Sequence, residues 1–484
     1  MRVERGTAII GVAVAGWLAS GASWAAEPSQ PHPNILFITV DDLRDHIGAF
    51  GHPHVLTPNI DRLAAQGVLF HRAYCQVPVC GASRASVMTG IRPDLAQGRF
   101  TDYNSRADRD TPHAVTLGAH FKAHGYQTLS RGKVFHDETD SADAWSEPPW
   151  RLLYAVDKPG LHSWATHHFD KTWLDPASRT NVSAEGRGPY WEAADVPDNA
   201  YEDGQTADRA VADLTRLKRM QVPFFLAVGF FRPHLPFNAP KRYYDLYDPE
   251  AIPLANNRFP IENLPPECQN SGEIRSYAGI EGWPDDRVFH RQARHAYYAS
   301  VTYVDAQIGR LLDEIDRLGL AGNTIIVLWS DHGFHLGEHH FWGKHNTLDN
   351  ALRVPLIVSA PGYASGARTK ALVELVDIYP TLVELAGLAP PGGHALEGRS
   401  FVPLLKRPDL PWQKAAFSEW RGGRSVKTGR HLYTEWPNGN RMLFDHDTDP
   451  DERKNVADDP AFADIVQYLS ALLAKPAHTL QVDQ

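Results

Sequence analysis

Continuously apolar stretches of strand length recur along the first three quarters of the chain. They are residues 34–40, 223–230, 323–330 and 355–360, and the more polar residues 127–134 are also predicted to form a strand. Stretches of this kind lack the alternation of a half-exposed strand, so we expect both faces of each strand to be covered.

Helical periodicity separates these stretches. Helices are predicted over residues 57–70, 115–124, 206–219, 299–318 and 373–388. The clearest case is 299–318, where Val301, Val304 and Ile308 share one face and Gly319 follows as a stop. In the last helix, residues 373–388, Pro380 is expected to cause an interruption. This alternation predicts an α/β fold with a mixed, mostly parallel sheet and helices on both faces.

The pattern changes after the Pro-Pro-Gly-Gly stretch at 390–393. Residues 416–420, 424–428 and 431–436 predict short antiparallel strands, and residues 462–474 predict a terminal helix. We therefore expect a catalytic domain over residues 26–405 and a smaller C-terminal α+β subdomain over residues 406–484. Residues 140–200, rich in Trp, Pro and Asp, are expected to form an insertion over the active face.

The N-terminus has the features of a secretory signal. Arg2 and Arg5 precede an apolar run over 8–19 and a cleavage site at Ser23-Trp24-Ala25. Residues 1–25 are therefore predicted to be a signal peptide of a periplasmic or secreted protein, with no membrane span elsewhere. The formal net charge of -10 argues against a broad nucleic-acid-binding surface.

Acidic residues directly follow two of the apolar stretches. Asp41 and Asp42 come after residues 34–40, and Asp331 and His332 come after residues 323–330. The carboxyl ends of parallel strands form the edge at which ligands bind, and buried paired carboxylates require a cation. Hard oxygen ligands favour Ca²⁺ or Mg²⁺, while a helix N-cap is the alternative interpretation of Asp41–Asp42.

Basic residues follow other predicted strands. Lys133 and His136 lie at the end of residues 127–134, His234 follows residues 223–230, and Lys344 lies in the loop after Asp331. Lysine can hold an oxyanion and histidine can move a proton near neutral pH, although in a chain with 24 histidines a structural role is the default for each one. Together with the acids, they predict hydrolysis of a sulfate or phosphate ester beside a divalent cation.

Cys80 opens a short predicted helix within the stretch Cys80-Gly81-Ala82-Ser83-Arg84. Free N–H groups and the helix dipole favour an anion at a helix N-terminus, and Arg84 can form a forked contact with an oxyanion. By itself the stretch is equally consistent with a buried free cysteine beside a solvated arginine.

The residues C-G-A-S-R at 80–84 resemble the nucleophile signature of the type I sulfatases, C-x-(P/A)-S-R. The resemblance runs from about residue 33 to residue 460 and is greatest to the iduronate-2-sulfatase group. It rests on NILFITVDDLR, CGASRASVMTG, TDYNS, GKVFH, FFLAVGFFRPHLPF and SDHGFHLGEHHFWGKHN, which occur in the family's order. It implies the alkaline-phosphatase-like fold.

The resemblance also implies a modified nucleophile and a metal ion. In that family a maturase oxidises the cysteine to formylglycine, whose hydrated aldehyde attacks the sulfur of a sulfate ester. Cys80 would be converted in this way and would bind one calcium ion together with Asp41, Asp42, Asp331 and His332. Ala82 replaces the proline of many members, which is typical of bacterial sequences and hints at an anaerobic radical maturase.

Further roles carry over residue by residue. Arg84 would steady the formylglycine oxygens, and Lys133 and Lys344 would hold sulfate oxygens. His136 would help to expel sulfate and regenerate the aldehyde, and His234 would act at the leaving-group oxygen. Conversion of Cys80 would leave Cys75 and Cys268, whose pairing stays open.

The implied substrate is a 2-O-sulfated uronate of a heparan-, dermatan- or algal-type saccharide. Asp102, Asn104, Arg424 and Lys427 are candidates for sugar or carboxylate contacts, with ordinary solvated surface as the alternative for each. Other hypotheses are a phosphomonoester or phosphonate hydrolase, a sulfatase for 6-O-sulfated glucosamine, a saccharide-binding protein with a vestigial site, and a cysteine hydrolase that uses Cys80 as a thiolate.

Overall fold

The computed structural model describes Met1 and residues 32–152, 172–280, 287–412 and 415–475, and residues 33–484 make up one compact unit. The predicted signal peptide lies outside the described residues apart from Met1. Among the described helices, none has the length and apolar character required to cross a membrane. Cys75, Cys80 and Cys268 are all buried and free, so Cys75 and Cys268 do not pair.

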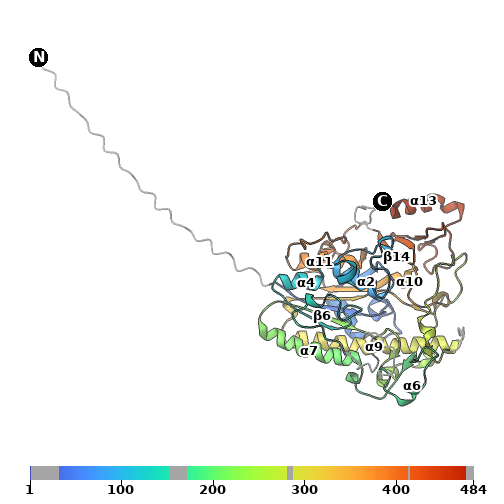
Figure 1. The fold of residues 1–484 in the computed structure, drawn as a ribbon, viewed down its shortest axis with the longest axis horizontal. Coiled ribbons are helices and arrows are strands. Elements are labelled where there is room, and N and C mark those ends of the chain that lie inside the picture. Colours follow the sequence, from blue (N-terminus) through green and yellow to red (C-terminus); the bar gives the residue numbers. More distant parts are fainter. Residues whose placement is uncertain (2–31, 153–171, 281–286, 413–414, 476–484) are drawn as a thin grey trace. The chain divides into compact units, whose positions relative to one another are not determined.

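Seven strands of the described chain form the central sheet (Figure 1). They are β1 (Asn34–Val40), β2 (Val68–Tyr74), β3 (Gln127–Gly132), β6 (Phe224–Phe230), β9 (Thr324–Ser330), β12 (Arg353–Ser359) and β13 (Ala367–Glu374). Their order is β13-β2-β12-β9-β1-β6-β3. Neighbouring strands are parallel except at β12, which runs antiparallel to β2 and β9. The predicted mixed, mostly parallel sheet is confirmed.

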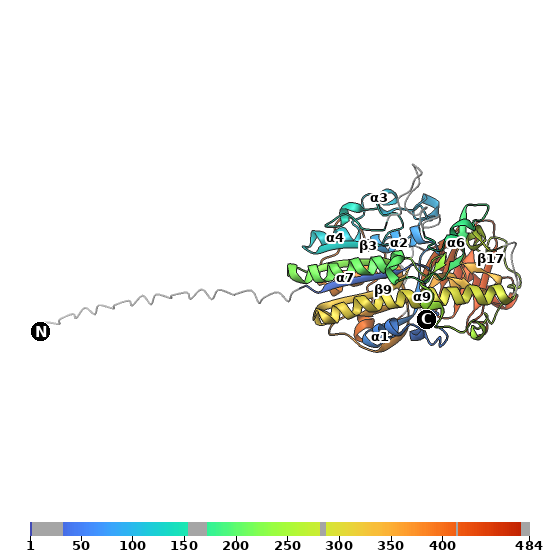
Figure 2. The same ribbon diagram turned by 90° about the horizontal axis from the view of Figure 1, so that it is seen from below.

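Helices cover both faces of this sheet (Figures 1 and 2). The longer ones are α1 (Pro58–Gln66), α2 (Cys80–Thr89), α4 (Leu117–Ala123), α7 (Glu202–Met220), α9 (Arg287–Arg317) and α11 (Ile378–Leu385). Because successive strand residues point to opposite faces, Leu36 and Ile38 pack in one core with α1, α7 and α9, whereas Ile35 and Phe37 pack in another with α2, α4 and α11. Burial on both faces explains why the central strands are apolar at consecutive positions.

Two strands of the sheet, β2 and β13, were not predicted from the sequence. The helix predicted to reach residue 70 ends at Gln66, because Gly67 lies against the β12 backbone, where a Cβ would be 2.4 Å from the Val358 oxygen. β13 is an edge strand with the polar sequence Arg368-Thr369-Lys370, so it does not have the apolar signature of a central strand.

The prediction for residues 373–388 is correct only for its second half. β13 continues to Glu374, and α11 begins at Ile378. Pro380 therefore lies in the first turn of α11, where its missing N–H has no helical acceptor to lose. It does not interrupt a helix.

The described parts of the insertion between β3 and β6 are tied to later loops. They include α6 (Pro176–Thr180), β4 (Arg187–Pro189) and β5 (Trp191–Glu192). β4 pairs with β8 (Tyr277–Ala278), and β5 pairs with β7 (Phe237–Asn238). Another short pair follows β9 and joins β10 (His335–Leu336) to β11 (Trp342–Gly343). Elsewhere in the described chain before residue 416, the remaining short α-helices are α3 (Ala107–Asp110), α8 (Lys241–Tyr244), α10 (Asp349–Leu352) and α12 (Val402–Lys406).

The C-terminal region contains the expected antiparallel sheet. It consists of β14 (Ala416–Trp420), β15 (Gly423–Lys427), β16 (His431–Glu435) and β17 (Arg441–Asp445), in that order. The terminal helix α13 (Ala463–Leu473) shares a small apolar core with this sheet, which includes Val426, Leu443 and Leu469. β17 is a strand that the sequence pattern did not reveal.

Candidate active site

The carboxyl ends of β1 and β9 lie side by side at one edge of the central sheet. The two strands are parallel with Val40 opposite Ser330, so the residues that follow are neighbours. The possible ligand atoms of Asp41, Cys80, Asp331 and His332 all lie within 4.8 Å of one another, and all four residues are buried. The structure thus brings together four of the residues that the sequence pointed to.

Asp42 borders this cluster. Its backbone N–H donates to Asp331 Oδ1 at 3.2 Å, and its Oδ1 lies 3.4 Å from His332 Nε2. Lys344 Nζ donates to both Asp42 carboxylate oxygens, at 2.7 and 3.0 Å. Lys344 is therefore placed beside the cluster by Asp42, as Lys133 is by an ion pair with Asp41.

Cys80 is the first residue of α2, and Val79 before it is in extended conformation. Gly81, the second residue of the helix, allows the loop at Tyr103 to approach, because a Cβ at this position would lie 2.1 Å from the Tyr103 carbonyl oxygen. The start of the helix and this loop are therefore in backbone contact at the edge of the site.

Replacing Gly81 with alanine is expected to lower the free energy of unfolding by about 1–3 kcal/mol, because the methyl group would overlap with backbone that cannot rotate away. Helix propensity alone would favour alanine by about 1 kcal/mol, so a loss identifies the overlap. Gly322→Ala is the control, because a Cβ there meets no atom within 4 Å. Urea unfolding of both variants decides the point, and a Gly81→Ala protein as stable as the parent would contradict the prediction.

Arg84 holds the acidic side of the cluster together. Its Nε donates to Asp331 Oδ2 at 2.9 Å, its Nη2 lies 3.3 Å from Asp41 Oδ1, and its Nη1 donates to the backbone oxygens of Lys133 and Val134. The side chain is fully buried. Arg84 therefore points toward the two carboxylates that neighbour Cys80.

The cluster is suited to a divalent cation because its carboxylates are buried close together. Burial raises the pKa of Asp331 to about 7 and, despite Lys344, raises the pKa of Asp42 well above its usual range. Burial alone would also raise the pKa of Asp41, but Lys133 and Arg84 hold it well below its usual range. Asp41 Oδ1 and His332 Nε2 are buried without a hydrogen-bond partner in the described residues. A bound cation would give both atoms a partner.

A cavity of about 340 Å³ opens over Cys80. Its lining includes the predicted residues His136, His234 and Lys344, together with Tyr103, Glu185, Arg187, Glu273 and His345. The last five were not singled out from the sequence. They lie in loops and short strands without periodicity, and pairing of β4 with β8 is what brings Arg187 here.

Glu273 connects two of the predicted basic residues. Its Oε2 lies 3.3 Å from Lys344 Nζ, and its Oε1 lies 3.4 Å from His234 Nε2. His234 Nδ1 lies 2.6 Å from the Leu235 carbonyl oxygen. Both ring nitrogens of His234 therefore face oxygen acceptors.

In the TDYNS loop, residues 101–105, Asp102 and Asn104 were the expected substrate contacts, but the residue that lines the cavity is Tyr103. Asp102 and Asn104 stabilise the turn itself, because the Asn104 N–H donates to Asp102 Oδ1 at 2.8 Å and the Asp102 N–H donates to Ser105 Oγ at 3.1 Å. Tyr103, between them, lines the cavity. The loop therefore borders the site through Tyr103.

Arg424 and Lys427 are not among the residues that line this cavity. Arg424 donates to the Leu473 carbonyl oxygen and pairs with Glu419 at 3.4 Å. Lys427 is buried, which lowers its pKa to about 8. The structure therefore places neither residue at this cavity: Arg424 is exposed on β15, and Lys427 is buried within the C-terminal region.

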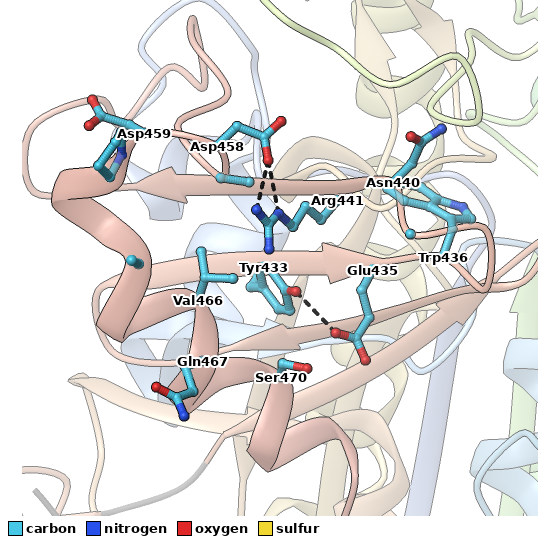
Figure 3. A pocket seen from close by; sticks show the side chains of 14 residues that line it. Tyr433, Glu435, Trp436, Asn440, Arg441, Asp458, Asp459, Val466, Gln467 and Ser470 are labelled. Carbon is cyan, nitrogen blue, oxygen red and sulfur yellow. Dashed lines mark hydrogen bonds and ion pairs between the residues drawn. The ribbon is translucent and has the colours of Figure 1, made fainter.

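The C-terminal region has a separate cavity of about 480 Å³ between β16, β17 and α13 (Figure 3). Tyr433 donates to Glu435 Oε2 at 3.0 Å, and Arg441 pairs with Asp458 at 2.9 Å. These side chains bond to one another across the sheet surface, and none of them lines the cavity at Cys80.

Comparisons with known proteins show which proteins this chain resembles. A family model described as Sulfatase matches residues 33–388, and a model described as N-sulphoglucosamine sulphohydrolase, C-terminal matches residues 337–479. Iduronate 2-sulfatase of Homo sapiens is 32% identical and covers 97% of this chain and 99% of that protein. A sulfatase of Formosa agariphila is 33% identical, and the match covers 92% of this chain and 86% of that protein. The phosphonate monoester hydrolase SpPMH from Silicibacter pomeroyi has a similar structure, with a TM-score of 0.72 at 26% identity. The match covers 91% of this chain and 94% of that protein.

Proposed function

Because this chain belongs to the sulfatase family and is a sulfuric ester hydrolase, we propose that it removes the sulfate of 2-O-sulfated uronate residues in polysaccharide fragments. The observation that carries the proposal is the position of Cys80, at a helix start, within 4.8 Å of three hard or borderline metal ligands and beside two lysines. The human relative is named for the same sulfate position.

Conversion of Cys80 to formylglycine by a maturase is part of the proposal. A thiol is a soft ligand and fits poorly among the carboxylates of Asp41 and Asp331, whereas the hydroxyl oxygens of a hydrated aldehyde are hard. A calcium ion held by Asp41, Asp42, Asp331, His332 and the modified residue would supply positive charge for the nucleophile and the sulfate oxygens.

The remaining residues then have assigned roles. The hydroxyl group at position 80 would lose its proton to the neighbouring Asp331 carboxylate as its oxygen bonds to sulfur and the bond between sulfur and the sugar oxygen breaks. His234 would donate the proton that the sugar oxygen takes away. Lys133 and Lys344 hold sulfate oxygens, and Arg84 steadies the nucleophile. His136 lines the cavity and is proposed to accept the proton of the second hydroxyl group, which releases sulfate and restores the aldehyde.

Arg187 supports a uronate as substrate. It lines the cavity at Cys80 and is braced there, since Nη1 donates to Ser276 Oγ at 2.6 Å and the guanidinium lies 5.2 Å from the centroid of the Tyr277 ring. A braced guanidinium is suited to a planar carboxylate. Glu185 lines the same cavity and is suited to a sugar hydroxyl.

A substrate panel tests the proposal. Protein co-expressed with a maturase would be offered disaccharides with 2-O-sulfated uronate or 6-O-sulfated glucosamine, and an aryl phosphate. Release of sulfate from the uronate ester alone supports the proposal. Release from the glucosamine ester would keep the sulfatase chemistry and overturn the sugar. Preferred cleavage of the phosphate would favour a phosphomonoester or phosphonate hydrolase; the Silicibacter neighbour is named for the second of these activities.

Arg187→Met is expected to lower kcat/KM for the 2-O-sulfated uronate by about 10–100-fold, because the substrate carboxylate loses a charge-assisted contact of about 1.5–3 kcal/mol. An aryl sulfate without a carboxylate should be cleaved as before. Arg209→Met, with a half-exposed arginine on α7, is the matched control. An equal loss on both substrates would contradict the role of Arg187 in recognition.

Export and domain organisation complete the proposal. Residues 1–25 would be removed as a signal peptide, leaving a periplasmic or secreted enzyme. Residues 26–405 would form the catalytic domain and residues 406–484 the C-terminal subdomain. Mass spectrometry of the N-terminus of protein from the culture medium and periplasm checks the cleavage site.

A further inference from the structure

A second cluster of possible metal ligands lies in the segment that follows β1. It consists of Asp45, His46 and His52, whose ligand atoms lie within 4.8 Å of one another. Asp45 and His46 are buried and His52 is half-buried. The three residues line a cavity of about 380 Å³ that shares no lining residue with the cavity at Cys80.

The two histidine rings lie together, with 4.1 Å between their centroids. His46 is only 8% exposed, and its Nδ1 is buried without a hydrogen-bond partner among the described residues. A buried polar atom left without a partner is costly, because it has lost water and gained nothing in exchange. This nitrogen therefore indicates a ligand.

Asp45 is oriented in the way that metal-binding carboxylates are. Arg353 Nη1 lies 2.9 Å from its Oδ2, whereas Arg44 Nε is 3.5 Å from its Oδ1, beyond the usual length of an N–H···O hydrogen bond. Oδ1 therefore keeps an available lone pair. Carboxylates that bind a metal ion through one oxygen are typically held by a hydrogen bond to the other, as Arg353 holds Oδ2 of Asp45.

The side chains that line the cavity carry a net negative formal charge. Five carboxylates line it, against three guanidinium groups. The acids are Asp45, Glu338, Asp349, Asp451 and Glu452, and the bases are Arg44, Arg294 and Arg353. The arginines next to Asp45 thus do not make the cavity positive.

We propose that Asp45, His46 and His52 bind a divalent transition-metal ion, with Zn²⁺ as the ion that best matches the ligands. Two imidazoles and one carboxylate are a common set for zinc, and water or His54, which lines the same cavity, would complete the coordination. The cluster at Cys80, with its harder oxygen ligands, would take a different ion. Because Asp45 is three residues from Asp42, the bound ion would also fix the segment that carries the acids of the active site.

Co²⁺ serves as a probe of this site. The full chain carrying Cys80→Ala would be titrated with Co²⁺ in excess calcium, which occupies the cluster of hard ligands, and visible absorption would report the cobalt. We expect one Co²⁺ per chain with the bands of a low-coordinate nitrogen and oxygen site, and loss of these bands when Zn²⁺ is added.

His52→Ala is expected to weaken Co²⁺ binding by at least about tenfold, and this half-exposed position should tolerate the change. His46→Ala should have the same effect, and exposed His113→Ala is the matched control. The proposal is overturned if the parent binds no Co²⁺ in excess calcium, or if the His52 and His113 variants bind it equally well. Zn²⁺ should also raise the thermal midpoint of the parent and leave that of the His52 variant unchanged.

Discussion

Replacing Cys80 with alanine is expected to lower sulfate release by on the order of 10⁴-fold or more, because covalent catalysis loses its nucleophile. Arg84, Lys133 and the acidic cluster would remain, and they would still bind sulfate without being able to attack it. The measurement is sulfate release from the preferred substrate by protein co-expressed with a maturase.

Cys75→Ala is the matched control for this prediction. Cys75 is buried five residues before Cys80, and its Sγ lies 3.8 Å from the Ala351 carbonyl oxygen. The Cys75 variant should release sulfate as the parent does. If the Cys80 variant kept more than about a tenth of the activity, the nucleophile would have to be another residue.

Thiol alkylation separates the two kinds of chemistry that Cys80 could perform. Burial would raise the pKa of the Cys80 thiol, but Lys133 and the His332 ring lower it overall, so an unconverted thiol would be reactive. A formylglycine enzyme should keep its activity after treatment with iodoacetamide, with a peptide mass that shows the sulfur lost. Complete inactivation of an active protein whose peptide mass shows an unconverted Cys80 thiol would instead support a cysteine hydrolase.

Replacing Arg84 with methionine is expected to lower the free energy of unfolding by about 3–5 kcal/mol. Methionine approximates the length of the side chain but removes the positive charge from between Asp41 and Asp331, both fully buried. The two carboxylates would then face each other without this partner, and two backbone oxygens would lose their donor. Urea unfolding in the presence of a chelator measures the loss without compensation from bound metal.

An exposed ion pair provides the control for Arg84. Arg62 pairs with Asp313 at 2.7 Å, but the side chain of Asp313 is 67% exposed. Water screens such a pair, so Arg62→Met should change the free energy of unfolding by less than about 1 kcal/mol. Similar effects of the two substitutions would show that Arg84 is not the partner on which the buried carboxylates depend.

The strands at the centre of the sheet were predictable because burial on both faces leaves an unbroken apolar stretch in the sequence. The acids at the ends of β1 and β9 were predictable for a related reason, since parallel strands deliver the residues that follow them to one edge. A helix beginning at Cys80 was likewise recognisable from local sequence. In each case the signal lies within about ten neighbouring residues.

The edge strand β13 and the walls of the cavity depend on long-range contacts instead. Glu273 and Arg187 come from loops that carry no periodicity, and Arg187 reaches the site because β4 pairs with β8, some ninety residues away in the chain. Arg424 was expected at the substrate, but the register of β15 and the position of α13 direct it to the Leu473 carbonyl oxygen.

The sequence by itself therefore determined the central strands of the sheet and its reactive edge, because hydrophobic burial and strand ends leave local patterns. The residues of the proposed chemistry followed from the resemblance to the sulfatases. Only the tertiary structure decided which side chains surround the substrate and which histidines share a cavity, as His46 and His52 do. Those arrangements depend on the free energy of packing distant loops together, and that leaves no periodic signal in the chain.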